Sequence, residues 1–153
     1  MRIALFEPDI AGNVGAILRT AACLNVAVDL IEPMGFTFSD RALARAGMDY
    51  ARSAQVTRHA DFAAFAAALQ GRLVLATTKG ATRLDTAAFE AGDTLLFGSE
   101  GTGVPDHVHD RADARVVVPM MPGMRSLNVG VSVALVLGAA LQQTGGWPAP
   151  PPA

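Results

Sequence analysis

An apolar run near the C-terminus most constrains what this chain can fold into. Residues 129–141 read VGVSVALVLGAAL, with one serine and two glycines among otherwise apolar side chains. About 20 apolar residues are needed to cross a bilayer, so this run is too short to be a membrane span. A helix that is apolar on nearly every side must be buried on most of them. We therefore predict a buried helix over about residues 127–143.

The bulk composition indicates a folded protein of one domain. The chain has 153 residues, of which 51% are hydrophobic and 17% charged, and these values argue against intrinsic disorder. Cys23 is alone, which excludes an internal disulfide, and His59, His107 and His109 lack companions at metal-ligand spacing. The N-terminal segment MRIALFEPD has acidic residues after a short apolar stretch, whereas a signal peptide needs a longer apolar region. We predict a cytoplasmic protein that needs no metal.

The charged residues argue against a protein that coats nucleic acid through a wholly basic surface. The net charge is −2, with eleven arginines and a single lysine, Lys79. Arginine favours bidentate recognition of phosphate and carboxylate groups. The nearest feature to a basic patch lies at positions 41–58 and consists of Arg41, Arg45, Arg52 and Arg58. By itself this group is also compatible with an ordinary solvated face.

Strand-like and helix-like segments alternate along the chain. Such alternation predicts an α/β fold with a mostly parallel sheet flanked by helices. Helix caps are expected at Asn13, Ser39, Asp61 and Ser126. A Pro-rich tail over 145–153 is expected to be disordered, which leaves one domain over 1–144. The expected strands are 2–6, 26–31, 72–78, 93–98 and 114–119, and the expected helices are 14–24, 39–47, 61–71 and 127–143.

Glycine, proline and polar residues follow the ends of the expected strands. In parallel sheets, ligands bind at the carboxyl ends of the strands, so a site is expected at this edge. GSEGTG (98–103) follows one strand, but its glycines fit neither the dinucleotide fingerprint nor the phosphate loop. A tight turn before a short helix near Val104 explains it equally well. The Met-rich loop PMMPGM (119–124) has the apolar character of a pocket lining.

Several blocks of this sequence resemble the SPOUT superfamily of methyltransferases, the α/β-knot enzymes, and within it the TrmH-like class. Three of them carry most of the match: NVGAILRTAACL (13–24), LLFGSEGTGVP (95–105) and VVVPMMPGMRSLNVGVSVALVLGAAL (116–141). Shorter segments resemble the TrmL-type branch of small tRNA 2′-O-methyltransferases: IEPMGF (31–36), RAGMDY (45–50) and TTKG (77–80). The resemblance covers essentially the whole chain except the tail.

The resemblance implies a C-terminal deep trefoil knot, a homodimer whose active site takes residues from both subunits, and S-adenosylmethionine as cofactor. It implies that Arg19 is catalytic, with Asn13 beside it, and that Ser126 and Asn128 orient cofactor and ribose. RNA phosphates are expected to meet Arg41, Arg45, Arg52 and Arg125. The cofactor is expected to lie against Ala76, Thr77, Gly98, Glu100, Gly103, Val118, Met120, Ser126 and Leu127.

The activity implied by the resemblance is 2′-O-methylation of the wobble nucleotide of tRNA, cytidine 34 or uridine 34, with the anticodon stem-loop as partner. Because a guanidinium is essentially always protonated, we expect Arg19 to anchor phosphate and stabilise alkoxide charge rather than to act as a base. Three alternatives stay open. They are methylation of another tRNA or rRNA position, a knotted RNA-binding protein without catalysis, and a nucleotide-binding oxidoreductase.

Overall fold

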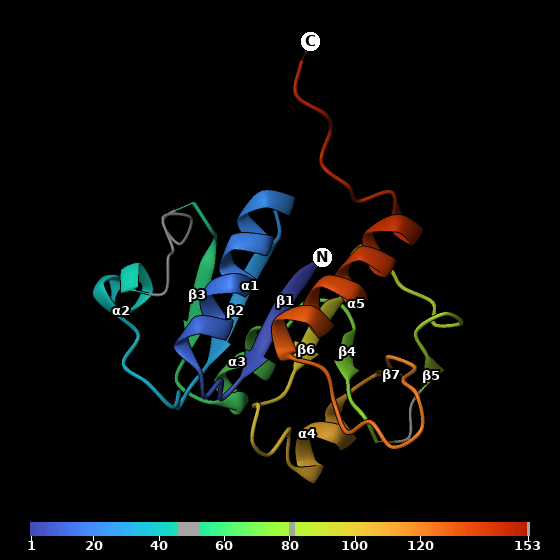
Figure 1. Cartoon of the computed structure of the whole chain (residues 1–153), viewed down its shortest axis with the longest axis horizontal. Helices are drawn as coiled ribbons and strands as arrows, with labels where there is room; N and C mark the ends of the chain where they lie inside the picture. The colour runs from blue at the N-terminus through green and yellow to red at the C-terminus, as the bar shows by residue number, and fades with distance from the viewer. Residues whose placement is uncertain (46–52, 80–81, 153) are drawn as a thin grey trace.

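A seven-stranded sheet forms the centre of the molecule, in a computed structural model that describes residues 1–45, 53–79 and 82–152 (Figure 1). The strand order is β3-β2-β1-β6-β4-β7-β5, and every strand pairing in it is parallel. The strands are β1 (Arg2–Phe6), β2 (Ala27–Ile31), β3 (Val56–His59), β4 (Leu73–Ala76), β5 (Thr82–Arg83), β6 (Thr94–Phe97) and β7 (Ala114–Val117). The helices are α1 (Ala11–Leu24), α2 (Asp40–Arg45), α3 (Phe62–Ala68), α4 (Asp106–Arg111) and α5 (Val129–Thr144).

Helices cover both faces of the sheet, as a buried parallel sheet requires. Alternate residues of β1 point to opposite faces, so Ile3 belongs to one core cluster and Ala4 to the other. The first cluster contains the apolar faces of α1 and α5, and the second contains Phe65 of α3 and Val108 of α4. The predicted fold class is therefore confirmed. The trefoil knot implied by the resemblance stays a prediction.

The two edge strands of the sheet, β3 and β5, were not predicted from the sequence. β3 reads VTRH and is nowhere fully buried, and β5 has only two residues, both exposed. Neither shows the apolar run or the alternation on which strand prediction depends. By contrast, β1 has the predicted bounds because four of its five residues are buried.

Two predicted helix caps are wrong. α1 begins three residues earlier than predicted, with Ile10 at its N-cap, so Asn13 lies inside the helix. α5 is capped by Asn128, whose side-chain oxygen accepts hydrogen bonds from the backbone amides of Gly130 and Val131, and Ser126 lies outside it. The other two caps are confirmed, since Ser39 Oγ accepts from Ala42 N and Asp61 Oδ1 from Ala64 N.

The C-terminal helix α5 has one buried side and one exposed side. Val133, Val136, Leu137, Ala140 and Leu141 are buried, whereas Val131 and Leu135 are 49% and 45% exposed. The helix ends at Thr144, before Gly145 in the left-handed region, and Trp147 Nε1 then donates to Gln142 Oε1 over 3.0 Å. Disorder of the tail stays a prediction. No helix in the described part of the chain has both the length and the apolarity to cross a membrane.

Candidate functional site

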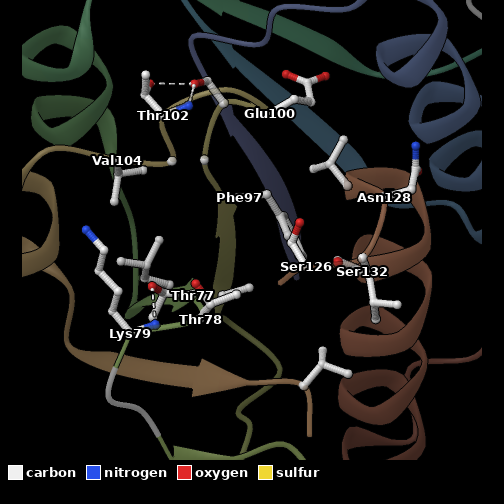
Figure 2. A pocket seen from close by; sticks show the side chains of 18 of the residues that line it. Thr77, Thr78, Lys79, Phe97, Glu100, Thr102, Val104, Ser126, Asn128 and Ser132 are labelled. Carbon is white, nitrogen blue, oxygen red and sulfur yellow. Dashed lines mark hydrogen bonds between the residues drawn. The ribbon is translucent and has the colours of Figure 1, made fainter. Parts of the chain in front are cut away.

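A pocket of about 580 Å³ lies at the carboxyl ends of β4, β6 and β7 and beside the first turn of α5 (Figure 2). This is the edge at which ligands bind in parallel sheets. Most of the residues that the sequence nominated for the site meet here, although they come from distant parts of the chain. They are Asn13, Ala76, Thr77, Gly98, Glu100, Gly103, Val118, Met120, Arg125, Ser126, Leu127 and Asn128.

The GSEGTG segment forms a tight turn that shapes one side of the pocket. Ser99 and Gly103 exchange two backbone hydrogen bonds of 2.9 and 3.0 Å, and Ser99 Oγ lies 2.9 Å from Thr102 Oγ1. A Cβ at Gly98 would lie 2.6 Å from the carbonyl carbon of Gly103, so the turn closes only around glycine. Gly103 itself has φ +70°, a conformation that glycine adopts without strain. The predicted tight turn, followed by a short helix, is confirmed.

Glu100 ties this turn to the start of α1. Its Oε2 accepts a hydrogen bond from the backbone amide of Asp9 over 2.8 Å, and its Oε1 accepts one from Asn13 Nδ2 over 3.0 Å. The backbone amide of Gly101 donates in return to Asp9 Oδ2. Both carboxylate oxygens of Glu100 are thus engaged within the chain, which indicates that it positions the turn at the pocket wall.

Asn13 extends this link to the last helix. Its Oδ1 accepts a hydrogen bond of 3.0 Å from Asn128 Nδ2, while Asn128 Oδ1 caps α5. Consecutive hydrogen bonds therefore join Glu100, Asn13 and Asn128, which belong to three different segments. We call this group the Glu100–Asn13–Asn128 network. From its position inside the first turn of α1, Asn13 contacts both Glu100 and Asn128.

The loop before α5 leaves its backbone groups available to a ligand. Within residues 118–127, the one backbone hydrogen bond to another described residue runs from Met124 N to Met121 O. Val118, Met120, Ser126 and Leu127 of this loop line the pocket. Open amide and carbonyl groups beside a cavity can bind the polar edges of a planar ligand. The segment after β4, which also lines the pocket, is hydrogen-bonded within the chain. Thr77 N donates to Val116 O, and Thr77 Oγ1 accepts from Lys79 N.

The remaining predicted residues lie away from the pocket. Arg19 is exposed on α1 and does not line it. Arg41 and Arg45 are exposed on α2, which Figure 1 places beyond the β3 edge of the sheet, whereas β4 and β7 lie toward the other edge. Arg52 falls outside the described residues. Of the three nominated RNA contacts that the structure describes, Arg41, Arg45 and Arg125, only Arg125 lines the pocket.

Sequence reasoning missed several lining residues. The floor is apolar and comes from strand ends and the α4 lead-in, namely Leu75, Phe97, Val104 and Val116. Their position at the carboxyl ends of strands could have signalled them. Ile10, Thr78, Ser99, His109, Val129 and Ser132 also line the pocket. His109 gave no such signal, because nothing in the sequence shows that α4 turns one side toward the strand ends.

No group of three or more His, Cys, Asp or Glu side chains placed to hold a metal occurs in residues 1–45, 53–79 and 82–152. That the protein needs no metal stays a prediction.

The fold and the pocket together define an α/β methyltransferase of the SPOUT type. The family model described as the SpoU rRNA Methylase family matches residues 1–138, and the chain belongs to this family. A tRNA (cytidine(34)-2′-O)-methyltransferase from Ancylobacter novellus is 49% identical over 150 residues, covering 96% of this chain and 95% of the relative. The protein of the same description from Escherichia coli K12 is 39% identical, covering 95% and 94%.

Solved structures agree with this assignment. One, described as giving structural insights into the 2-OH methylation of C/U34 on tRNA, has a TM-score of 0.87 at 38% identity and covers 93% of this chain and 94% of that one. An AdoMet-bound rRNA methyltransferase from Sinorhizobium meliloti has a TM-score of 0.81 at 25% identity, over 92% of this chain and 55% of that one.

The pocket residues fit S-adenosylmethionine. The cavity volume of about 580 Å³ lies within the range of about 300–1,000 Å³ typical of small-molecule sites. Its apolar floor suits a flat base, and the open backbone groups of residues 118–127 suit the polar edges of base and ribose. Glu100 places negative charge beside the pocket, which suits a sulfonium cation better than a phosphate.

Proposed function

We propose that this chain transfers a methyl group from S-adenosylmethionine to the ribose 2′-hydroxyl of the wobble nucleotide of tRNA, cytidine 34 or uridine 34. The observation that carries the proposal is the convergence of three sequence blocks on one pocket. Asn13, Glu100 and Asn128 are far apart in sequence, yet consecutive hydrogen bonds join them at its rim. Relatives that align with nearly the whole chain are described as tRNA (cytidine(34)-2′-O)-methyltransferases.

The residues of this chain have distinct parts in the reaction. When bound, the cofactor would supply a methyl group that is already electrophilic and would leave as S-adenosylhomocysteine. The protein has to position the two reactants and let the 2′-hydroxyl proton pass to water as the oxygen is methylated. The loop of residues 118–127 holds the cofactor through its backbone. Ser126 orients cofactor and ribose, and Asn128 acts by fixing the end of this loop to α1. Arg19 binds the adjacent phosphate and stabilises negative charge on the attacking oxygen as a protonated guanidinium.

The position of Arg19 favours a site completed by a second copy of the chain. Arg19 does not line the pocket of its own chain, whereas a charge-stabilising group has to reach the reacting oxygen. The exposed apolar side chains also gather around the pocket and α5: Met121, Met124, Leu127, Val131 and Leu135. Clusters of exposed large apolar side chains are typical of protein interfaces. A homodimer would bury it and bring Arg19 of one chain toward the pocket of the other.

The tRNA would be bound by charges concentrated on the dimer surface, because the chain as a whole is slightly acidic. Arg125 at the pocket and Arg41 and Arg45 on α2 are the proposed phosphate contacts, together with Arg52. Arg58 is less suited to RNA, since it pairs with Glu32 and lies over the Phe38 ring. We expect the enzyme in the cytoplasm, where tRNA is modified.

A substrate that lacks only the reacting hydroxyl tests the proposal. The purified protein is incubated with labelled S-adenosylmethionine and either an unmodified tRNA or the same tRNA with a 2′-deoxynucleotide at position 34. We expect label in the first tRNA and none in the second. Equal labelling of both would move the methyl group to another position and contradict the proposal.

Two variants separate catalysis from binding. Arg19→Ala should bind S-adenosylmethionine normally but transfer methyl groups about a hundred- to a thousandfold more slowly, because losing one charge-stabilising donor typically costs about 2.7–4 kcal/mol. Arg19→Lys keeps the charge but loses the planar fork, and should recover only part of the rate.

Mixing Arg19→Ala with a pocket variant such as Ser126→Ala should restore activity if each site contains residues of two chains. Mixtures no more active than their components would exclude the shared site.

A further inference from the structure

Among the pocket residues, His109 combines a polar side chain with deep burial. It lies in the last turn of α4, and only 8% of its surface is exposed. The described residues form no hydrogen bond with either ring nitrogen, although the backbone of His109 is paired on both sides, N to Pro105 O and O to Ala112 N. Its ring nitrogens are nevertheless absent from the buried atoms that lack a partner. The polar atoms of the ring are therefore open to the pocket, which His109 lines.

The surroundings of His109 give its ring a restricted choice of partners. Leu75 is fully buried, and Val104, Val116 and Phe97 are 8%, 3% and 2% exposed, so this end of the pocket is an apolar floor. Water can hydrogen-bond the ring nitrogens while the pocket is open, but a ligand that fills the pocket displaces this water, and ring nitrogens left without a partner would then weaken its binding. A buried, unpaired imidazole that faces a cavity is therefore suited to a partner that the cavity receives.

The chemistry of the cofactor indicates which part would reach this floor. The ribose and the amino-acid group of S-adenosylmethionine are polar, and they suit the rim at Thr102, Ser126 and Ser132. The adenine ring is flat and suits an apolar floor on its faces, but its edge carries ring nitrogens that accept hydrogen bonds and an amino group that donates them. Imidazole can donate or accept, so it can pair with this edge in either tautomer.

We propose that His109 hydrogen-bonds the edge of the adenine base and so contributes to the selection of an adenine cofactor. This inference rests on the proposed function, because it assumes that the pocket receives S-adenosylmethionine. His109 is a binding residue here and takes no part in methyl transfer. Its loss should therefore raise the KM for the cofactor without changing kcat or the KM for tRNA.

Calorimetry with S-adenosylhomocysteine tests the proposal on the whole protein. His109→Leu, which fills similar space without a polar atom, should weaken binding by about three- to tenfold, the usual range for one neutral hydrogen bond. His109→Gln keeps a donor and an acceptor and should recover part of the affinity. The matched control is His107→Leu on the same helix. The His107 ring is exposed, lies 5.8 Å from Phe62 between centroids and does not line the pocket.

Two further readouts distinguish base recognition from a structural role. The inosine counterpart of S-adenosylhomocysteine changes only the base edge, so wild type should prefer the adenine compound and His109→Leu should lose part of that preference. The ¹⁵N resonances of the His109 ring should shift when S-adenosylhomocysteine is added, and those of His107 should not. The melting temperature of His109→Leu should not fall, because the ring makes no hydrogen bond to the described residues that leucine would remove.

The outcomes separate this inference from the proposed function. If wild type binds no S-adenosylhomocysteine, the proposed function fails. If wild type binds it and His109→Leu binds equally well, with equal preference for adenine, the role of His109 is overturned. Weaker binding with unchanged preference and unmoved ¹⁵N resonances would also overturn it, since that pattern indicates an indirect effect on pocket shape.

Discussion

Asn128 Nδ2 donates a hydrogen bond of 3.0 Å to Asn13 Oδ1, joining residues that are 115 positions apart in sequence. The same Asn128 side chain caps α5, and the same Asn13 side chain donates to Glu100. Two hydrogen bonds, both made by Asn13, thus connect the first turn of α1, the turn after β6 and the start of the last helix. The pocket is formed where these three segments meet, so its shape depends on their being held together.

Two substitutions of Asn128 separate its capping from its link to Asn13. Asn128→Ala removes the acceptor for Gly130 N and Val131 N, and should lower the free energy of unfolding by about 1 kcal/mol, the usual effect of losing an N-cap. Asn128→Asp keeps a capping oxygen but loses the Nδ2 donor, and should recover most of this loss. Chemical denaturation measures both. If the alanine variant is as stable as wild type, the cap has no energetic role.

Gly98 should tolerate no side chain. A Cβ there would meet the backbone of Gly103 at 2.6–2.9 Å, and backbone atoms cannot rotate out of the way as a side chain can. Gly98→Ala should therefore distort the turn, abolish measurable cofactor binding and lower the melting temperature. Gly12→Ala is the matched control, because nothing lies within 4 Å of its Cβ and alanine in a helix is favoured over glycine by about 0.5–1 kcal/mol. Normal binding by Gly98→Ala would contradict the geometry of the turn.

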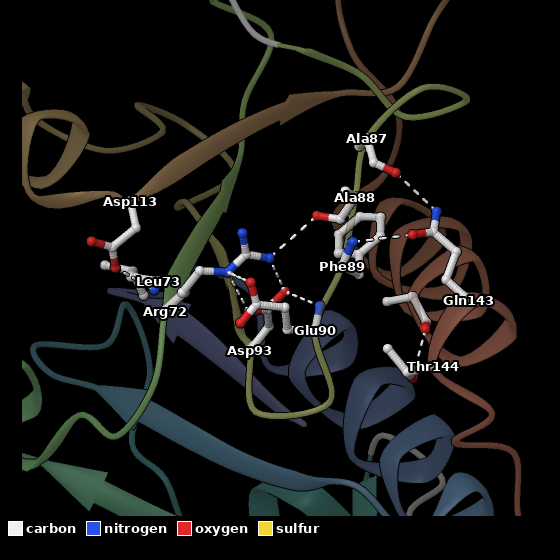
Figure 3. A network of polar contacts seen from close by, with 11 residues as sticks. Arg72, Leu73, Ala87, Ala88, Phe89, Glu90, Asp93, Asp113, Gln143 and Thr144 are labelled. Atoms are coloured by element: carbon white, nitrogen blue, oxygen red, sulfur yellow. Dashed lines mark hydrogen bonds and ion pairs between the residues drawn. The ribbon is translucent and has the colours of Figure 1, made fainter.

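The fully buried Asp93 anchors the connection between β5 and β6 (Figure 3). It accepts hydrogen bonds from Arg72 Nε and Nη2 and from the backbone amide of Glu90, and the bond to Asp93 raises the pKa of Arg72. Asp93→Asn should lower the free energy of unfolding by about 2–3 kcal/mol, less than the 3–5 typical of fully buried pairs because Arg72 is partly exposed.

The exposed pair of Arg83 and Asp85 is the control for Asp93. Its geometry is also bidentate, with distances of 2.8 and 3.0 Å, but solvent screens both groups. Asp85→Asn should leave the thermal unfolding curve unchanged within error. If Asp93→Asn has an equally small effect, burial of the carboxylate is not what stabilises this segment.

Asp85 also gives a pH-dependent prediction. Hydrogen bonds from Arg83 lower the pKa of Asp85, so the folded protein binds this proton more weakly than the unfolded chain. The resulting stabilisation is small because solvent screens the pair. It is present above the unfolded pKa of about 3.9 and is lost as the pH falls through the lower folded value. An NMR titration should place the Asp85 pKa below that of an ordinary Asp, and Arg83→Gln should move it back up. An unchanged pKa in the variant would refute this cause.

The sequence predicted the central part of this fold well because local pattern and burial agree there. β1 and the apolar side of α5 follow from their own residues. Asn13 was wrongly taken as a cap because residue type alone does not reveal partners such as Glu100 and Asn128, which are distant in sequence. Ser126 was wrongly taken as a cap because Asn128, two residues later, is also a capping residue type and takes that position. His109 was missed for the same reason, since its exposure to the pocket depends on how α4 folds back against the strand ends.

The most direct test of the account is mass-spectrometric mapping of ribose methylation in tRNA from cells with and without the gene for this chain. We expect 2′-O-methylation at nucleotide 34 to disappear without the gene and to return with the wild-type gene but not with Arg19→Ala. Loss at another tRNA or rRNA position would keep the chemistry and contradict the substrate. Unchanged methylation at every position would contradict the central claim that this chain is a ribose methyltransferase.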